Sequence, residues 1–171
     1  SQFQLMKAES PGPSVGKLVP KVGATARILY IIYFAMTVIT IVLLLLGGMD
    51  PFDAITISFG TAGTGGFGVK ADSCASYSTF CIWVITIFML LFGVNFNFYY
   101  YLIFNRIRDA FRMEEVRWYF IIVGAATGIC FVTLLNTFAP FEALTHAAFQ
   151  VATIITTTGY ATTDFNVWHA A

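Results

Sequence analysis

Residues 51–68 read PFDAITISFGTAGTGGFG, and residues 140–160 read PFEALTHAAFQVATIITTTGY. Each stretch opens with proline, phenylalanine, an acidic residue and alanine, continues through a short helix-compatible segment, and ends in a run rich in threonine and glycine. An apolar segment of roughly 10–14 residues is too short to cross a bilayer and suits a re-entrant helix. The sequence therefore predicts a repeated unit, and such a repeat carries more weight than any single motif.

Long uncharged runs surround both copies of this unit. They cover residues 28–49, 73–105, 118–141 and 143–163. A membrane helix needs about 20 predominantly apolar residues, so each of the first three runs can span a bilayer. The unit is thus a membrane helix, a re-entrant helix, an extended Thr/Gly strand and a second membrane helix.

The composition excludes most classes of soluble protein. Of 171 residues, 58% are apolar and only 11% are charged, whereas a soluble domain carries roughly 25% charged residues. Nine basic residues balance nine acidic ones, which leaves no electrostatic argument for binding nucleic acid. We therefore expect an all-α integral membrane chain in contact with lipid. The sequence pattern offers no nucleophile, paired catalytic carboxylates or metal cluster, which argues against an enzyme.

The expected layout has four parts. Residues 1–23 form a cytoplasmic linker, 24–105 a complete repeat, 106–117 a basic cytoplasmic connector, and 118–171 a partial repeat whose following helix is missing. In the complete repeat we place a membrane helix at about 24–46, a pore helix at about 51–60, the filter at 61–68 and a membrane helix at about 77–105. In the partial repeat we place a membrane helix at about 118–136, a pore helix at about 140–155 and the filter at 156–161. The chain begins with serine and reads as a piece of something longer.

The Thr/Gly segments carry the expected chemistry. Basic residues before the first membrane helix and in the connector place those parts in the cytoplasm, so both Thr/Gly segments open to the outside. Non-helical backbone at membrane depth survives only where it is buried in protein or lines a water-filled path. Glycine lets successive carbonyls point the same way, and the negative C-terminal end of each short helix points toward the path. This arrangement favours a dehydrated cation.

The start of each short helix has its own signals. Asp50 is expected at the N-cap, Pro51 at the first helical position and Asp53 in the first turn, while Pro140 and Glu142 take the matching places in the second copy. Asp53 and Glu142 could instead form a surface ring that attracts cations. Acidic residues in a first turn are expected on helix grounds alone, so the capping role is favoured.

Other polar features have simpler explanations. Residues 63–68 satisfy G-x-G-x-x-G, but the strand and amphipathic helix that a dinucleotide site requires are both missing from the pattern. His146 is expected to hydrogen-bond a neighbour in a structural role. Asn95 and Asn97 cannot share a helix face, so at most one lines a vestibule, and a structural role is favoured for both.

Several stretches spread over nearly the whole chain resemble one known family. They are AESPGP, GKLVPK, PFDAI, GTAGTGGFG, VITIFMLLFGVNF, EALTHAAFQV and TTTGYATTDF. The family is the Trk/Ktr/HKT superfamily of potassium transporters, specifically the bacterial TrkH-type membrane subunits. The resemblance implies four helix–pore helix–helix repeats around a pseudo-fourfold pore, each repeat giving one filter strand. This chain would hold repeat two and the first part of repeat three.

The resemblance also implies the site. Gly66 and Gly159 would be the central filter glycines, and glycine at both positions fits potassium rather than sodium. K⁺ would bind to backbone carbonyls as the transported ion, with no covalently bound cofactor. The residues that would supply these carbonyls or flank them are Thr64, Gly65, Gly66, Phe67, Thr157, Thr158, Gly159 and Tyr160.

Partners and location follow from the same resemblance. The chain would pack with the remaining repeats of the same transporter, and we expect a homodimer of the full-length protein. A cytosolic nucleotide-binding ring would regulate it, and the location would be the inner membrane of a bacterium, crossed several times.

Two other functions stay open from the sequence. One is a re-entrant-loop channel for another solute, such as a neutral molecule. The other is a structural membrane subunit without a transport role of its own, in which filter substitutions would leave transport unchanged.

Overall fold

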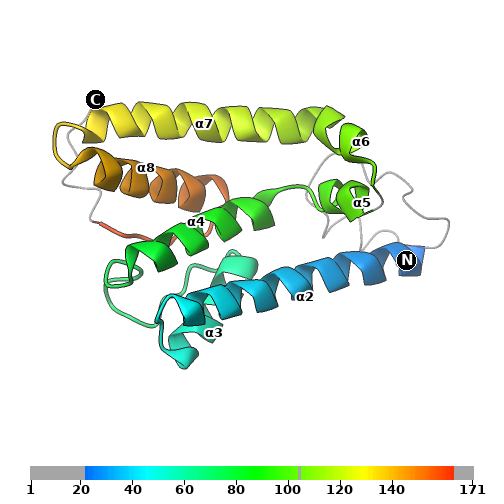
Figure 1. Cartoon of the computed structure of the whole chain (residues 1–171), viewed down its shortest axis with the longest axis horizontal. Coiled ribbons are helices and arrows are strands. Elements are labelled where there is room, and N and C mark those ends of the chain that lie inside the picture. The colour runs from blue at the N-terminus through cyan, green and yellow to red at the C-terminus, as the bar shows by residue number, and fades with distance from the viewer. Residues whose placement is uncertain (1–21, 104, 164–171) are drawn as a thin grey trace. The chain divides into compact units, whose positions relative to one another are not determined.

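The computed structural model describes residues 22–103 and 105–163, and it is all-helical over those ranges, with no β-strand among them. The expected all-α class is therefore confirmed. Most of the expected linker, residues 1–23, lies outside the described residues. The described chain divides into two compact units, which are treated separately below: 22–36 with 94–121, and 37–93 with 122–163. Figure 1 shows the helices in chain order.

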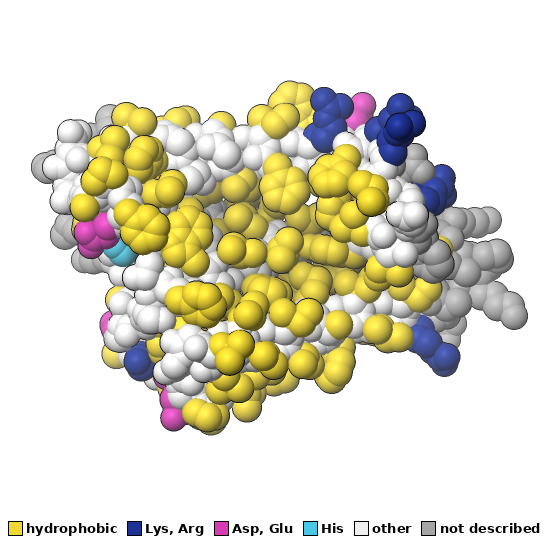
Figure 2. Space-filling view, in the orientation of Figure 1, with side chains coloured by type: hydrophobic (Ala, Val, Ile, Leu, Met, Phe, Trp, Pro, Cys, Tyr) yellow, Lys and Arg dark blue, Asp and Glu magenta, His cyan; other side chains and the backbone are white. Residues whose placement is uncertain are grey.

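Two helices are long and apolar enough to cross a membrane. They are α2 (Val22–Leu46) and α7 (Glu114–Leu134). A third span is possible if α4 (Thr79–Gly93) and α5 (Asn97–Ile103) count together as one broken span. Large apolar side chains along α2 and α7 are exposed within the described chain, and hydrophobic side chains cover much of the face drawn in Figure 2. Such helices suit a surrounding of lipid and other helices.

The sequence predicts one helix over about 77–105, and the structure instead breaks it after Gly93. Asn95 explains the new start, because its side-chain oxygen accepts a hydrogen bond from the backbone N–H of Asn97 at 3.0 Å. Asparagine favours such a capping position over a helix interior. The Asn95 amide also donates to the carboxylate of Glu115 at 2.9 Å. Asn95 thus has the structural role that was favoured for it.

The first unit has its own small core around α5 and α6 (Ile107–Arg112). The expected connector, residues 106–117, therefore contains α6 and the start of α7. Phe98 meets Phe111 edge to face, with ring centroids 5.5 Å apart. The buried members of this core are Val94, Phe98, Ala110 and Val116.

The second unit holds the two short helices, α3 (Pro51–Ala62) and α8 (Pro140–Ile155). α4 packs against both of them. Trp83 of α4 donates its indole N–H to the hydroxyl of Thr145 on α8 at 3.2 Å. Leu134, at the end of α7, lies in a buried cluster with Ala143 and Ala147 of α8. Both Thr/Gly segments belong to this unit, and α4 is the element that their two short helices share.

Candidate functional site

The N-termini of the short helices are stabilised in different ways. The carboxylate of Asp50 accepts a hydrogen bond from the backbone N–H of Phe52 at 3.0 Å, and Pro51 follows at the first helical position. Ala139 precedes Pro140 in the second copy and has no side chain that can cap. The first helix is therefore capped by a side chain, whereas the second begins on proline alone.

The first-turn acids also differ. Asp53 is buried and accepts a hydrogen bond from the hydroxyl of Tyr77 at 2.9 Å. Glu142 is exposed and lies 3.9 Å from Nε2 of His146. The structure therefore does not place the two carboxylates in equivalent surroundings.

The two helices end with the same backbone pattern, displaced by 93 positions. Gly65 N–H donates to the carbonyl of Gly60 at 2.8 Å, and Thr158 N–H donates to the carbonyl of Thr153 at 2.9 Å. A second matched pair joins Gly63 to Phe59 at 2.8 Å and Thr156 to Ala152 at 3.1 Å. The repeat found in the sequence is thus also a repeat of backbone hydrogen bonds.

Four residues in these segments have left-handed backbone angles at matched positions. Gly66 has φ +65° and Gly159 has φ +92°, while Thr64 and Thr157 have φ +49° and +57°. A β-branched residue in this region is an outlier, and such strain concentrates at functional sites. In both copies, one residue separates the two left-handed positions. Successive peptide groups are therefore rotated relative to one another.

The structure brings the two Thr/Gly segments together. A Cβ added at Gly66 would overlap the carbonyl oxygen of Thr158 and lie 2.8 Å from its carbonyl carbon, and it would lie 3.2 Å from the carbonyl carbon of Gly159. The backbone of Gly66 in the first segment therefore touches the backbone of the second segment at Thr158 and Gly159. Only glycine allows this approach.

The carbonyl oxygens of these segments have few partners among the described residues, and that of Thr158 lies against Gly66. Within the described residues, no hydrogen bond reaches the backbone oxygens of Thr64, Gly65, Gly66, Thr157, Thr158 or Gly159. Backbone carbonyls without a partner need water or a ligand. Rings of such carbonyls can replace the hydration shell of an ion.

The two aromatic residues that follow the central glycines lie in opposite surroundings. Tyr160 is 1% exposed and donates its hydroxyl to the carbonyl of Ile57 on α3 at 3.2 Å. A Cβ added at Gly60 would overlap that hydroxyl. Phe67, the matching residue of the first copy, is 81% exposed in the described chain. Because Gly60 has no side chain, the Tyr160 hydroxyl can lie against α3 at this position.

Threonine side chains hold the second segment, a feature that the sequence analysis missed. Thr153 accepts a hydrogen bond from the backbone N–H of Gly159 through its hydroxyl at 3.0 Å. The hydroxyls of Thr156 and Thr158 lie 2.7 Å apart, and Thr156 also donates to the carbonyl of Ala152 at 2.7 Å. The four threonines between residues 153 and 158 were the available signal.

The loop after the first segment reaches the end of the second. Cys74 N–H donates to the carbonyl of Ala161 at 3.0 Å, and Ala161 N–H donates to the hydroxyl of Ser73 at 3.2 Å. The loop is also fixed by the bond between Tyr77 and Asp53, and the ammonium of Lys70 lies 4.3 Å from the centre of the Tyr77 ring. Sequence reasoning did not identify these contacts.

Burial changes the acid–base behaviour of this loop. Burial raises the pKa of the Cys74 thiol to about 12. Burial, followed by the hydrogen bond to Asp53, also raises the pKa of Tyr77. Both groups therefore stay neutral at physiological pH.

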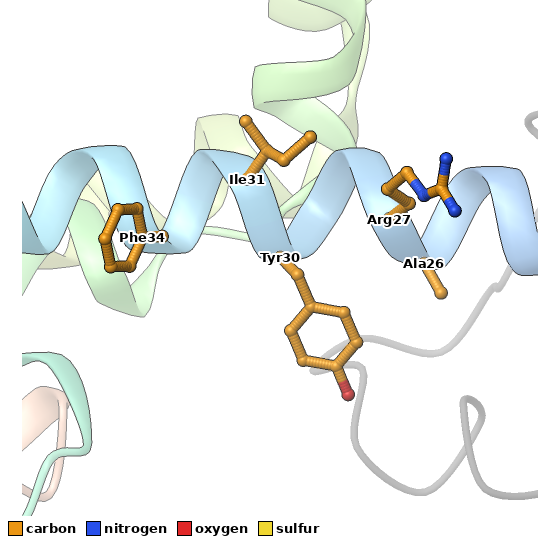
Figure 3. Close-up of a pocket in the computed structure, with 5 residues that line it drawn as sticks. All are labelled: Ala26, Arg27, Tyr30, Ile31 and Phe34. Carbon is orange, nitrogen blue, oxygen red and sulfur yellow. The ribbon is translucent and has the colours of Figure 1, made fainter.

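His146 and the remaining candidates add no second site. Nδ1 of His146 lies 2.9 Å from the hydroxyl of Thr162, in line with a structural role. No group of three or more metal-ligating side chains occurs within the described ranges. Figure 3 shows a shallow hollow on the surface of α2, and the side chains that line it all come from this one helix: Ala26, Arg27, Tyr30, Ile31 and Phe34.

Comparison with known proteins gives a consistent result. The family model TrkH, described as a cation transport protein, matches residues 2–171. The chain is 34% identical to the Trk system potassium uptake protein TrkH of Vibrio parahaemolyticus and 33% identical to that of Escherichia coli, in each case over 97% of this chain. The fold is similar to the crystal structure of the potassium transporter TrkH from Vibrio parahaemolyticus, with a TM-score of 0.83 and 28% identity over 98% of this chain. The chain spans 36% of the length of each of these relatives.

Proposed function

This chain belongs to the TrkH family of cation transport proteins, and we propose on that premise that it forms part of a potassium-uptake protein of the cell membrane. Potassium ions would pass along the backbone carbonyls of the two Thr/Gly segments, at Thr64–Phe67 and Thr157–Tyr160. Membership of a transport family agrees with the expectation that the chain is not an enzyme.

One observation supports this proposal above the others. The backbones of two segments 93 positions apart touch at Gly66 and Thr158, while the carbonyl oxygens on both sides accept no hydrogen bond within the described chain. A structural subunit has no need for strained backbone whose carbonyls are unpaired within the described chain. A channel for a neutral solute would be expected to present side-chain donors as well.

The short helices add electrostatic support. Each Thr/Gly segment begins where α3 or α8 ends. The C-terminal end of a helix carries about half a negative charge. A cation that loses water at the segments would therefore be stabilised by both helix ends as well as by the carbonyls.

The wider assembly is part of the same proposal. The described helices would form a complete repeat at 24–105 and part of the next repeat at 118–171, and the other repeats of the full-length protein would complete the pore. We further propose a homodimer, a location in the bacterial inner membrane, and regulation by a cytosolic nucleotide-binding ring.

The test is ion selectivity in the full-length protein. Gly159→Ser should lower the preference for potassium over sodium, because φ is +92° there while the space around a new Cβ is open. Gly48→Ser is the matched control, since Gly48 also has positive φ and open space but lies outside both segments. Rubidium uptake with sodium competition measures the preference. Unchanged selectivity in Gly159→Ser and in Gly66→Ser would favour a structural subunit or a channel for another solute.

A further inference from the structure

The loop between the first Thr/Gly segment and α4, residues 70–77, is held by hydrogen bonds on both sides. On one side, Tyr77 is hydrogen-bonded to the buried Asp53 in the first turn of α3. On the other side, Ser73 and Cys74 together bond both the N–H and the C=O of Ala161. The loop therefore connects the start of the first pore helix to the end of the second Thr/Gly segment.

The hydrogen bonds from the loop reach Ala161, which is next to the second Thr/Gly segment. Ala161 follows Tyr160 directly, and Tyr160 follows the central glycine of the second segment. The N–H of Ala161 belongs to the same peptide group as the carbonyl of Tyr160, and its C=O belongs to the next peptide group, so the two hydrogen bonds hold the peptide groups on both sides of Ala161. A rotation of the peptide group between Tyr160 and Ala161 would move the Tyr160 carbonyl, which is one of the carbonyls proposed to bind the ion.

The loop is also held by contacts within itself. Cys74 is fully buried, and Ser73 has φ +57° with its N–H bonded to the carbonyl of Lys70 at 3.1 Å. Lys70 in turn lies over the ring of Tyr77 at 4.3 Å. Ser73 and Cys74, which bond the second segment, thus belong to the same loop as Tyr77, which bonds Asp53.

We propose that residues 70–77 form a positioning loop by which the first repeat sets the geometry of the second repeat's ion-binding segment, with Ser73 and Tyr77 as its positioning residues. The proposal rests on the function proposed above for the Thr/Gly segments. It makes ion selection at the second segment depend on residues of the first repeat that do not touch the ion.

Two variants of the full-length protein test the loop. Ser73→Gly removes the hydroxyl that accepts from Ala161 and tolerates the positive φ. Tyr77→Phe removes the donor to Asp53 and keeps the ring beneath Lys70. Ser76→Gly is the matched control, because Ser76 lies in the same loop and its hydroxyl bonds Asp72 instead.

Hydrogen exchange is the first measurement, and it does not depend on transport. Loss of one hydrogen bond should speed exchange at the Ala161 amide about fivefold in Ser73→Gly and by a similar factor in Tyr77→Phe. Ser76→Gly should leave this amide unchanged. Equal exchange in all three variants and the unmodified protein would overturn the positioning loop, whatever the ion path is.

Selectivity is the second measurement. Rubidium uptake with sodium competition should show a lower preference for potassium in Ser73→Gly and Tyr77→Phe at equal amounts of folded protein, because a purely structural role would lower the amount and not the ratio. Faster exchange with unchanged selectivity, together with a selectivity loss in Gly159→Ser, would overturn the proposal that the loop sets ion selection. Faster exchange with unchanged selectivity in Gly159→Ser as well would instead remove the proposed ion path.

Discussion

The two Thr/Gly segments follow the same backbone path and are held in place by opposite means. Three positions at the end of α3 are glycine, and the three matching positions at the end of α8 are threonine: Gly60, Gly63 and Gly65 against Thr153, Thr156 and Thr158. The threonine hydroxyls bond the second segment to itself. Among the three glycines, Gly60 instead leaves space that the Tyr160 hydroxyl occupies. The two copies therefore share the backbone conformation but differ in the side chains that support it.

The largest expected effect separates the two central glycines. Gly66→Ala should prevent the two segments from meeting, since its new Cβ would overlap backbone atoms that cannot move aside. Gly159→Ala should be milder, because only the left-handed φ opposes it, at about 1–2 kcal/mol. Thermal midpoints of the purified full-length variants provide the comparison. Equal losses in both variants would show that the segments do not touch.

The contact between Gly60 and Tyr160 is tested next. Gly60→Ala should be strongly destabilising, since the new Cβ would overlap the Tyr160 hydroxyl. Adding Tyr160→Phe should restore much of the loss, because the nearest remaining ring atom lies 3.4 Å away. Tyr160→Phe alone should lower stability by about 1 kcal/mol through the hydrogen bond to Ile57. A double variant no more stable than Gly60→Ala would show that the Tyr160 hydroxyl does not occupy the space beside Gly60.

A smaller effect is expected from the threonines. Thr153→Ala should lower stability by about 1 kcal/mol and loosen the second segment only, because Gly159 N–H then loses its acceptor. Thr133→Ala on α7 is the control, since its hydroxyl bonds only carbonyls of its own helix. Hydrogen exchange at residues 156–161 is the readout, and equal exchange in the two variants would argue against the side-chain support.

The smallest effect concerns the Cys74 thiol, between the first repeat's loop and the second segment. Because burial raises its pKa to about 12, the thiol is neutral near pH 8 and the reactive thiolate increases about tenfold per pH unit up to that pKa. In a protein carrying Cys81→Ala and Cys130→Ala, labelling by a charged thiol reagent should be slow at pH 8 and leave uptake unaffected. Labelling should speed up in Gly66→Ala, where the segments separate. Rapid labelling at pH 8 in the unmodified background would show that the loop does not cover Cys74.

The sequence predicts local features well. The Pro-Phe-acid pattern locates the starts of α3 and α8, and the spacings from proline to central glycine anticipate that α8 is about one turn longer, at 16 residues against 12. These features depend on residues close together in the chain, where helix signals act.

Long-range contacts could not be predicted in the same way. Tyr160 reaches Ile57 across 103 positions, and Ala161 reaches Ser73 across 88. Nothing in the local pattern distinguishes Tyr160 from Phe67, since both follow a Thr/Gly run, yet one is buried and the other exposed. The break at Asn95 was also missed, because apolar residues on both sides favour one continuous helix. In each case the outcome depends on which neighbour the folded chain supplies.

The contact of Tyr160 with α3 has a consequence for the synthesis of the protein. Tyr160 lies in the later part of the chain, and Gly60, which leaves space for it, lies in the earlier part. The ribosome therefore synthesises α3 before the side chain that packs on it. The Tyr160 side chain can therefore reach its place only after α3 has been synthesised, so this contact is a late step of chain synthesis.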